Sequence, residues 1–215
     1  MSAAAAAAAA APAVTHLLYL HGFRSSPRST KAQKVRAWIA AHRPDVVWWC
    51  PQLSASPAAA MRDVFAGIAD WPRARTGIIG SSLGGFYATV VAERHGGRVV
   101  VLNPAVEPAR DLARAVGTTT AWHSDVPFEF RSVYVDELRA LAPPAVLTDP
   151  ERYLAVIATG DEVLSWREMR ARYAACRLRV VEGSDHALSD FDDHLPAVLA
   201  FLGLTAAQPA QWTSV

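Results

Sequence analysis

TGIIGSSLGGF, residues 76–86, joins a short apolar run to a longer segment whose apolar residues recur at helical spacing. Within it, Gly80, Ser82 and Gly84 form the pattern G-x-S-x-G, which is typical of a sharp turn between a strand and a helix. The two glycines leave space where side chains would collide with that strained turn. The stretch therefore predicts a strand, a helix, and a serine hydroxyl that points out of the sheet end between them. Ser81 is a competing hydroxyl, one position out of register.

The same alternation of short β-rich runs and longer Ala/Arg-rich stretches continues along the chain on both sides. It is the pattern of stacked βαβ units, so it predicts an α/β fold with a mostly parallel six-stranded sheet and helices on both faces. The expected strands are 15–20, 46–50, 76–80, 99–102, 153–159 and 178–181. The expected helices are 30–42, 58–71, 83–95, 166–175 and 192–203.

One interval, residues 104–149, breaks this rhythm and shows no clear strand. Within it, residues 118–130 (TTTAWHSDVPFEF) are aromatic and resemble a loop. Long loops in a domain of this size are usually functional, so a small lid-like insertion over a binding site is one interpretation. An ordinary pair of surface helices with a connector is the other.

Length and composition fit one soluble domain. The chain has 215 residues, and we expect residues 15–204 to form the domain, between an Ala-rich tail at 1–14 and a C-terminal tail at 205–215. The formal net charge of +1 gives no electrostatic reason for binding nucleic acid or an anionic membrane. No apolar stretch approaches the ~20 residues of a membrane helix, and the poly-Ala start makes a poor signal peptide. A cytoplasmic location is the simplest expectation.

An acid and a base follow the last two predicted strands. A serine hydroxyl needs a base to become a nucleophile, and the base needs an acid to orient it. Asp161 follows strand 153–159, and His186 follows strand 178–181. The order Ser82, Asp161, His186 is that of α/β-hydrolase triads, and all three lie at the carboxyl edge of the sheet. Glu162 is the alternative acid, and His123 could reach the site if the lid interpretation holds.

The end of the first strand, LLYLHGFRSSP at residues 17–27, predicts part of an oxyanion hole. In hydrolases, His-Gly at this place opens the loop whose backbone N–H binds the developing negative charge. Phe23 is the expected donor, with the N–H of Leu83 as the second, and Gly22 lets the backbone approach a substrate. An ordinary turn that ends in a helix cap is compatible with the same residues.

Some side chains near these positions are candidates for substrate contacts. His21 and Gly22 adjoin the expected oxyanion loop, and Trp122 belongs to the aromatic segment. Arg24 and Lys31 could meet an anionic handle such as a coenzyme A phosphate, although solvated surface charge is the alternative for both.

No cofactor is indicated, and metal binding is the weaker interpretation of the one candidate cluster. Residues 184–194, SDHALSDFDDH, contain four Asp and two His. The acids suit the start of the final helix, where negative charge interacts favourably with the positive end of the helix dipole. Cys50 and Cys176 are far apart and show no ligand spacing. We therefore expect no metal site.

Four blocks of the sequence resemble one known family. LLYLHGFRSSPRSTKAQKVRAWI, GSSLGGFYATVVAERHGGRVVVLNPAVEP, ATGDEVLSWREM and VEGSDHALSDF are similar to the YqiA-type esterases of the α/β-hydrolase superfamily. The resemblance runs from about residue 17 to residue 202. It implies a minimal hydrolase core that lacks the first two strands of the full fold, cleavage of short-chain acyl esters or thioesters, and a triad of Ser82, Asp161 and His186.

The expected function is thus that of a carboxylesterase or thioesterase-type serine hydrolase. Its partner is a small acyl ester or thioester, and we expect a monomer or a small homo-oligomer. Two alternatives stay open at this point: a member of the fold that binds ligands without turnover, because fold does not guarantee function, and a serine hydrolase that acts on amides or peptides.

Overall fold

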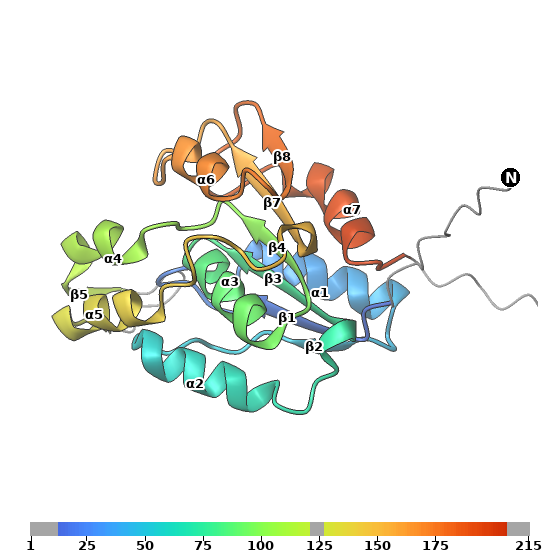
Figure 1. The fold of residues 1–215 in the computed structure, drawn as a ribbon, viewed down its shortest axis with the longest axis horizontal. Helices are drawn as coiled ribbons and strands as arrows, with labels where there is room; N and C mark the ends of the chain where they lie inside the picture. The colour runs from blue at the N-terminus through green and yellow to red at the C-terminus, as the bar shows by residue number, and fades with distance from the viewer. Residues whose placement is uncertain (1–12, 121–126, 206–215) are drawn as a thin grey trace, which may run out of the picture.

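The six apolar runs form one parallel sheet, shown in Figure 1. This computed structural model describes residues 13–120 and 127–205, so the terminal segments 1–12 and 206–215 and the candidates Trp122 and His123 lie outside the described residues. The sheet has the order β2-β1-β3-β4-β7-β8, and each neighbouring pair is parallel. All six predicted strands are confirmed. Their bounds are β1 His16–Leu20, β2 Val47–Trp49, β3 Thr76–Ser81, β4 Arg98–Leu102, β7 Tyr153–Ala158 and β8 Arg177–Val181.

The central strands are apolar throughout because both faces of the sheet are buried. Successive side chains on a strand point to opposite faces, so Ile78 of β3 enters one core and Ile79 the other. In the same way Val99 and Val101 of β4 lie in the first core, while Val100 lies in the second. Continuous apolar runs are what a parallel sheet covered on both sides requires.

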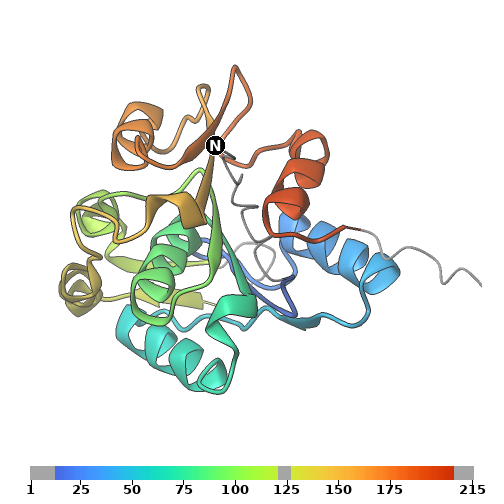
Figure 2. The same ribbon diagram turned by 45° about the vertical axis from the view of Figure 1, so that its right-hand side comes forward.

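Helices cover both faces, as Figure 2 shows. The helices α1 and α7 pack over one face, whereas α2, α3 and α6 pack over the other. No helix in the described part of the chain has the length and apolar content needed to cross a bilayer. The bounds are α1 Thr30–His42, α2 Pro57–Gly67, α3 Leu83–His95, α6 Trp166–Arg172 and α7 Phe191–Phe201.

The strand order reverses between β1 and β3. From β1 the chain moves outward to the edge strand β2, and then returns to form β3 on the other side of β1. The loops that leave β1 and β3 therefore diverge, one towards α1 and the other into α3. In open parallel sheets such a switch point leaves a crevice at the carboxyl ends of the strands, and ligands bind there.

The interval 104–149 differs from its sequence-based prediction. It contains two strands, β5 Gly117–Thr120 and β6 Pro127–Phe130, which pair antiparallel in a sheet of their own. It also contains the helices α4 Pro108–Asp111 and α5 Ser132–Leu141. Neither strand is long enough to be recognised from periodicity. The paired strands are anchored to the domain because Phe130 at the end of β6 is buried in the core beside α5. An isolated two-stranded hairpin needs such support to be stable.

The core predicts a large difference between two aliphatic truncations. Ile78 is 0% exposed at the centre of the sheet, whereas Val146 is 80% exposed on a loop. We expect Ile78→Ala to lower the free energy of unfolding by about 2–5 kcal/mol, because it removes buried methyl groups and leaves a cavity. Val146→Ala is expected to stay within about 0.5 kcal/mol of the wild type. Urea denaturation followed by circular dichroism measures both, and equal losses would contradict this description of the core.

Candidate active site

Ser82 lies in a strained turn between β3 and α3. Its φ is +56° and its ψ is −122°, a conformation that non-glycine residues rarely adopt. Backbone hydrogen bonds hold the turn: the N–H of Ser82 donates to Leu102 O at 3.0 Å, and the carbonyl of Ser82 accepts from Ala105 at 3.0 Å and from Gly85 at 2.8 Å. The serine is thus fixed to β4 on one side and to the first turn of α3 on the other.

The glycines of the motif are required by the close approach of α3 to the sheet. A Cβ atom at Gly80 would overlap the carbonyl of Gly84 and lie 2.6 Å from Ala88 Cβ. At Gly84 it would lie 2.7 Å from His21 O and closer still to Leu20 O. These neighbours are mainly backbone atoms, which cannot turn aside as a side chain can. The tight packing of backbone on backbone places the start of α3 directly behind the turn.

The structure brings together the three side chains that the sequence placed at separate strand ends. Ser82 Oγ lies 3.0 Å from His186 Nε2, and His186 Nδ1 lies 2.7 Å from Asp161 Oδ2. An ionised carboxylate accepts hydrogen bonds only, so Nδ1 carries the hydrogen of its contact with Asp161. In the neutral imidazole Nε2 is then the acceptor, and its lone pair faces the hydroxyl of Ser82.

The carboxylate of Asp161 is held in place by its own loop. Its side chain is 0% exposed. Oδ1 accepts the backbone N–H groups of Val163 at 2.9 Å and Leu164 at 2.7 Å, which leaves Oδ2 for the imidazole. Glu162, the alternative acid, bonds elsewhere: its Oε2 accepts the backbone N–H of His186 at 3.0 Å. Of the two carboxylates, it is Asp161 that contacts the ring.

Asn103 supports the histidine loop, and sequence reasoning did not single it out. It follows β4, has a φ of +41° and is 0% exposed. Its Nδ2 donates to the carbonyls of Asp185 at 2.9 Å and His186 at 3.1 Å, while its Oδ1 accepts from the N–H of Ala158 at 2.8 Å. The amide therefore ties the loop after β8 to the end of β7. A polar residue directly after an apolar strand (VVVLN) was the available signal.

Two backbone N–H groups lie where the sequence predicted an oxyanion hole. Leu83 is the first residue of α3, so its N–H has no partner within the helix. Phe23 follows Gly22, at which a Cβ atom would come within 3.2 Å of Ser82 Cβ and 3.6 Å of its Oγ. In the described residues neither N–H donates to a protein acceptor. The absence of a side chain at Gly22 keeps the Phe23 backbone close to the serine.

The hairpin β5–β6 contacts the loop after β1. The ring of Phe23 meets Phe128 at 5.3 Å and Phe130 at 5.1 Å between centroids, both in edge-to-face geometry. Arg24 has a φ of +58°, and its Nε donates to Thr120 O at 2.6 Å. The insertion thus packs against the expected oxyanion loop, and Arg24 contacts the hairpin.

His21 lines the site, but both of its ring nitrogens are occupied. Nε2 accepts the N–H of Leu53 at 3.1 Å, and Nδ1 lies 3.0 Å from Gly22 O. Burial lowers the pKa of His21, which favours the neutral ring that these two contacts require. The ring therefore holds the loops after β1 and β2 together and has no nitrogen left for a substrate.

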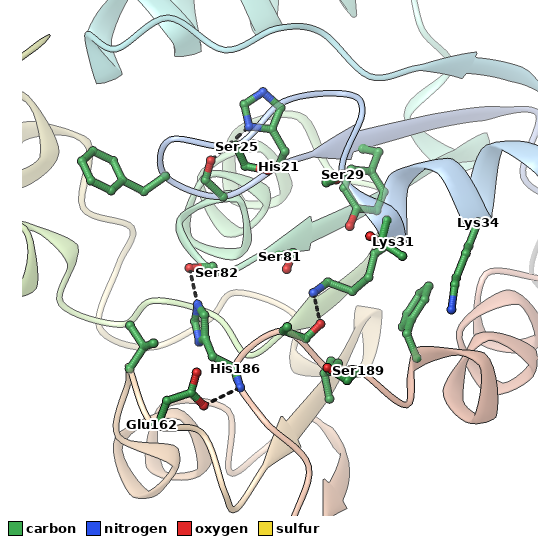
Figure 3. Close-up of a pocket in the computed structure, with 18 residues that line it drawn as sticks. His21, Ser25, Ser29, Lys31, Lys34, Ser81, Ser82, Glu162, His186 and Ser189 are labelled. Atoms are coloured by element: carbon green, nitrogen blue, oxygen red, sulfur yellow. Dashed lines mark hydrogen bonds between the residues drawn. The ribbon is translucent and has the colours of Figure 1, made fainter. Parts of the chain in front are cut away.

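A cleft of about 580 Å³ opens beside Ser82. Figure 3 shows Ser82 and His186 in contact on one side of it, with Lys31 and Lys34 on the α1 side. Phe23 also lines it, whereas Arg24 does not. The described residues contain no group of three or more His, Cys, Asp or Glu placed to hold a metal ion. In the cluster at 184–194, Ser184 bonds Asp190 at 2.5 Å, and Asp192 and Asp193 occupy the first turn of α7.

Comparison with protein-family models identifies the family of this chain. Residues 16–203 match the model described as uncharacterised protein family UPF0227. The chain belongs to this family. It is the YqiA-type esterase family that the sequence blocks resembled. The match covers every strand of the main sheet and the helices that pack on its two faces.

Solved structures agree on the α/β-hydrolase fold. A candidate hydrolase from Agrobacterium vitis S4 is similar with a TM-score of 0.69 at 17% identity, covering 89% of this chain and 91% of that one. Est1E from Butyrivibrio proteoclasticus with bound ferulic acid gives 0.66 at 15%, with 88% of each chain covered. The mouse α/β hydrolase domain-containing protein 10 gives 0.64 at 15%, again with 88% of each. At these identities the likeness shows the fold.

The packing behind the serine predicts that two glycines of β3, Gly77 and Gly80, differ in how well they tolerate substitution by alanine. At Gly77 a Cβ atom would meet only the ends of three side chains, at 3.1–3.3 Å, and these can move. We expect Gly80→Ala to lower the free energy of unfolding by about 1–3 kcal/mol more than Gly77→Ala does, since backbone has to shift at Gly80. Thermal and urea unfolding of the two variants measure the difference; a Gly80→Ala protein as stable as Gly77→Ala would contradict the packing described.

Proposed function

We propose that this protein is a serine esterase that cleaves short-chain acyl esters or thioesters through an acyl-enzyme. The observation that carries the proposal is the chain of contacts from Ser82 Oγ through the imidazole of His186 to the buried carboxylate of Asp161, at the edge of a cleft. The family, and the esterase names of similar structures such as Est1E, support the same reaction class.

In the first half-reaction Ser82 is the nucleophile. Its Oγ attacks the carbonyl carbon of the substrate while His186 Nε2 removes the hydroxyl proton. The carbonyl oxygen becomes an oxyanion, and the N–H groups of Phe23 and Leu83 donate to it. The positive end of the α3 dipole adds to this stabilisation because α3 begins directly after Ser82. Asp161 stays ionised, fixes the orientation of the ring and stabilises the imidazolium.

The first half-reaction ends when His186 gives its proton to the departing alcohol or thiol, which leaves the acyl group on Ser82. The second half-reaction repeats the cycle with water as the nucleophile. A water molecule then attacks the acyl carbonyl, with its proton passing to Nε2, and the tetrahedral intermediate collapses to release the acid and restore the hydroxyl. In each half-reaction His186 Nε2 therefore first accepts a proton and then returns it.

Substitution of the two adjacent serines tests the nucleophile. We expect Ser82→Ala to lower kcat/KM for 4-nitrophenyl butyrate by about 10⁴-fold or more, because among the described residues Ser82 has the hydroxyl that contacts His186 Nε2. Ser81→Ala removes the neighbouring hydroxyl and is expected to stay within about tenfold of the wild type. Initial rates, with circular dichroism to confirm folding, measure both.

A fluorophosphonate probe separates a working hydrolase from a binding protein of the same fold. The probe phosphonylates only an activated serine, so the wild-type protein is expected to label stoichiometrically, with the adduct at Ser82 in the peptide mass spectrum. Full ester hydrolysis by Ser82→Ala, or absence of any adduct on the folded wild-type chain, would overturn the proposed function.

The two carboxylates after β7 are expected to differ in effect. Asp161→Asn removes the negative charge that faces His186 Nδ1 and lets the imidazole take the wrong tautomer. We therefore expect kcat to fall by about 10³–10⁴-fold. Glu162→Gln keeps an oxygen that can accept the backbone N–H of His186, so its loss is expected to be about tenfold or less. Steady-state kinetics decide between them, and a larger loss for Glu162→Gln would assign the acid to Glu162.

A further inference from the structure

The cleft beside Ser82 has one basic wall. The sequence contains two lysines, Lys31 and Lys34, against nineteen arginines. Both lysines lie on α1 three residues apart, which places them on the same face of the helix. Both line the cleft that contains Ser82. Figure 3 shows them on the α1 side of the serine, while Glu162 lies beyond His186.

Lys31 is a half-buried cation whose ammonium group has more donors than protein acceptors. Its Nζ donates to the carbonyl of Ala187, the residue after His186. An ammonium group has three N–H donors. In the described residues the ammonium group of Lys31 has no second hydrogen-bond acceptor and no ion pair. Burial lowers the pKa of Lys31 to about 8, while the negative charges of Asp185 and Asp161 oppose that shift. The side chain is therefore mostly protonated at neutral pH.

Lys34 is paired, but weakly. Its Nζ lies 2.7 Å from Asp192 Oδ2 at the start of α7, and the two side chains are 31% and 70% exposed. A solvent-exposed pair of this kind contributes little net energy, so an incoming anion can compete with the aspartate. Lys34 thus adds positive charge at the outer end of the same wall.

Two residues that line the cleft have buried hydroxyls with no hydrogen-bond partner in the described residues, Tyr19 OH and Ser29 Oγ. Ser29 precedes α1 as its N-cap, yet its side chain makes no capping bond. Burial raises the pKa of Tyr19, so its hydroxyl keeps its proton and stays a donor. Unpaired buried hydroxyls are costly and are rare in folded proteins. Together with Lys31, which uses one of its three donors on Ala187 O, they give the cleft more hydrogen-bond donors than protein acceptors.

We propose that this wall, Lys31 with Lys34 and Ser29, is a subsite for an anionic group of the substrate, a carboxylate or a phosphate held away from the ester that Ser82 attacks. The inference rests on the proposed function and narrows its substrate class. Lys31 differs from an ordinary surface charge, because its side chain is half-buried, lines the cleft that contains Ser82 and donates to the histidine loop. The contact with Ala187 also ties α1 to the histidine loop, so the experiment has to separate charge recognition from support of His186.

Matched esters that differ in one charge measure recognition directly. For the acyl half, mono-4-nitrophenyl adipate is compared with its methyl ester. For the leaving half, the butyrate ester of 4-hydroxybenzoate is compared with that of methyl 4-hydroxybenzoate. The measured quantity is kcat/KM for the anionic ester divided by that for the neutral ester, at low salt, with the rate of Ser82→Ala subtracted. We expect the ratio to be about tenfold or more in at least one pair, the usual size of a charge-assisted hydrogen bond.

Three variants assign that preference to Lys31. Lys31→Met is expected to reduce the ratio to near one, and Lys31→Arg to retain most of it. Arg36→Met removes a positive charge from the exposed side of the same helix, outside the cleft, and is expected to leave the ratio unchanged. A structural defect at His186 lowers the rates for both esters together and does not change their ratio. If Lys31→Met fails to fold, the wild-type ratio and its pH dependence still test the inference.

The pH dependence gives a second readout. The anionic and neutral esters use the same triad, so any pH dependence of the chemical step cancels in the ratio. The charged groups around Lys31 are Asp161 and Asp185, whose negative charges favour its protonated form, with Glu162 and the Lys34–Asp192 pair on the surrounding elements. Lys31 loses its charge as the pH rises through about 8. The ratio is therefore expected to fall across that range in the wild type and to stay flat in Lys31→Arg.

The outcomes separate the two proposals. A ratio near one for both pairs, in a protein that hydrolyses the neutral esters and labels at Ser82, overturns the anionic subsite and leaves the esterase function standing. A preference that survives Lys31→Met, or that is lost in Arg36→Met, also overturns it. A folded protein that neither hydrolyses any of the four esters nor labels at Ser82 overturns both.

Discussion

The site depends on the packing of the first turn of α3 against β3 and the end of β1. Because Gly80, Gly84 and Gly22 have no side chains, backbone meets backbone there, and Ser82 is held in a conformation that it would not adopt in a free peptide. The cost of that strained turn is offset by the hydrogen bonds from β4 and α3 that converge on Ser82. This packing fixes the position of the Ser82 hydroxyl, and His186 and Asp161 are placed relative to it.

The partners of Ser82 are fixed by a second layer of contacts between strand ends. Asp161 is fixed by two N–H groups of its own loop, and the histidine loop is held by Asn103 at the end of β4 and by Lys31 on α1. These contacts reach the loop from the end of β4 and from α1. Preorganisation of this kind is what a serine nucleophile requires, since a small displacement of the base is costly to the rate. The same lysine lines the cleft, so one residue would both support the proposed base and supply charge to the proposed subsite.

The two sides of the cleft differ in character. On one side Phe23 lines the cleft, and its ring packs edge-on against Phe128 and Phe130 of the β5–β6 hairpin behind it. On the other side α1 presents ammonium and hydroxyl groups. An ester with one apolar part and one charged part matches this division better than a uniformly apolar one does. The hairpin also shows how an insertion can shape a site through the loop it supports, because Phe128 and Phe130 contact Phe23 and not Ser82.

The sequence by itself determined the strands, most of the helices and the order of Ser82, Asp161 and His186, because continuous apolar runs and a glycine-flanked serine are local patterns. It left Asp161 and Glu162 as alternatives, missed Asn103, and gave no sign that β5 and β6 pair. Only the tertiary structure decided these points. A hydrogen bond between residues 82 apart, such as that of Asn103 to Asp185, depends on which strands become neighbours. Neither composition nor periodicity encodes that directly, and the same is true of the wall that Lys31 and Lys34 form beside Ser82.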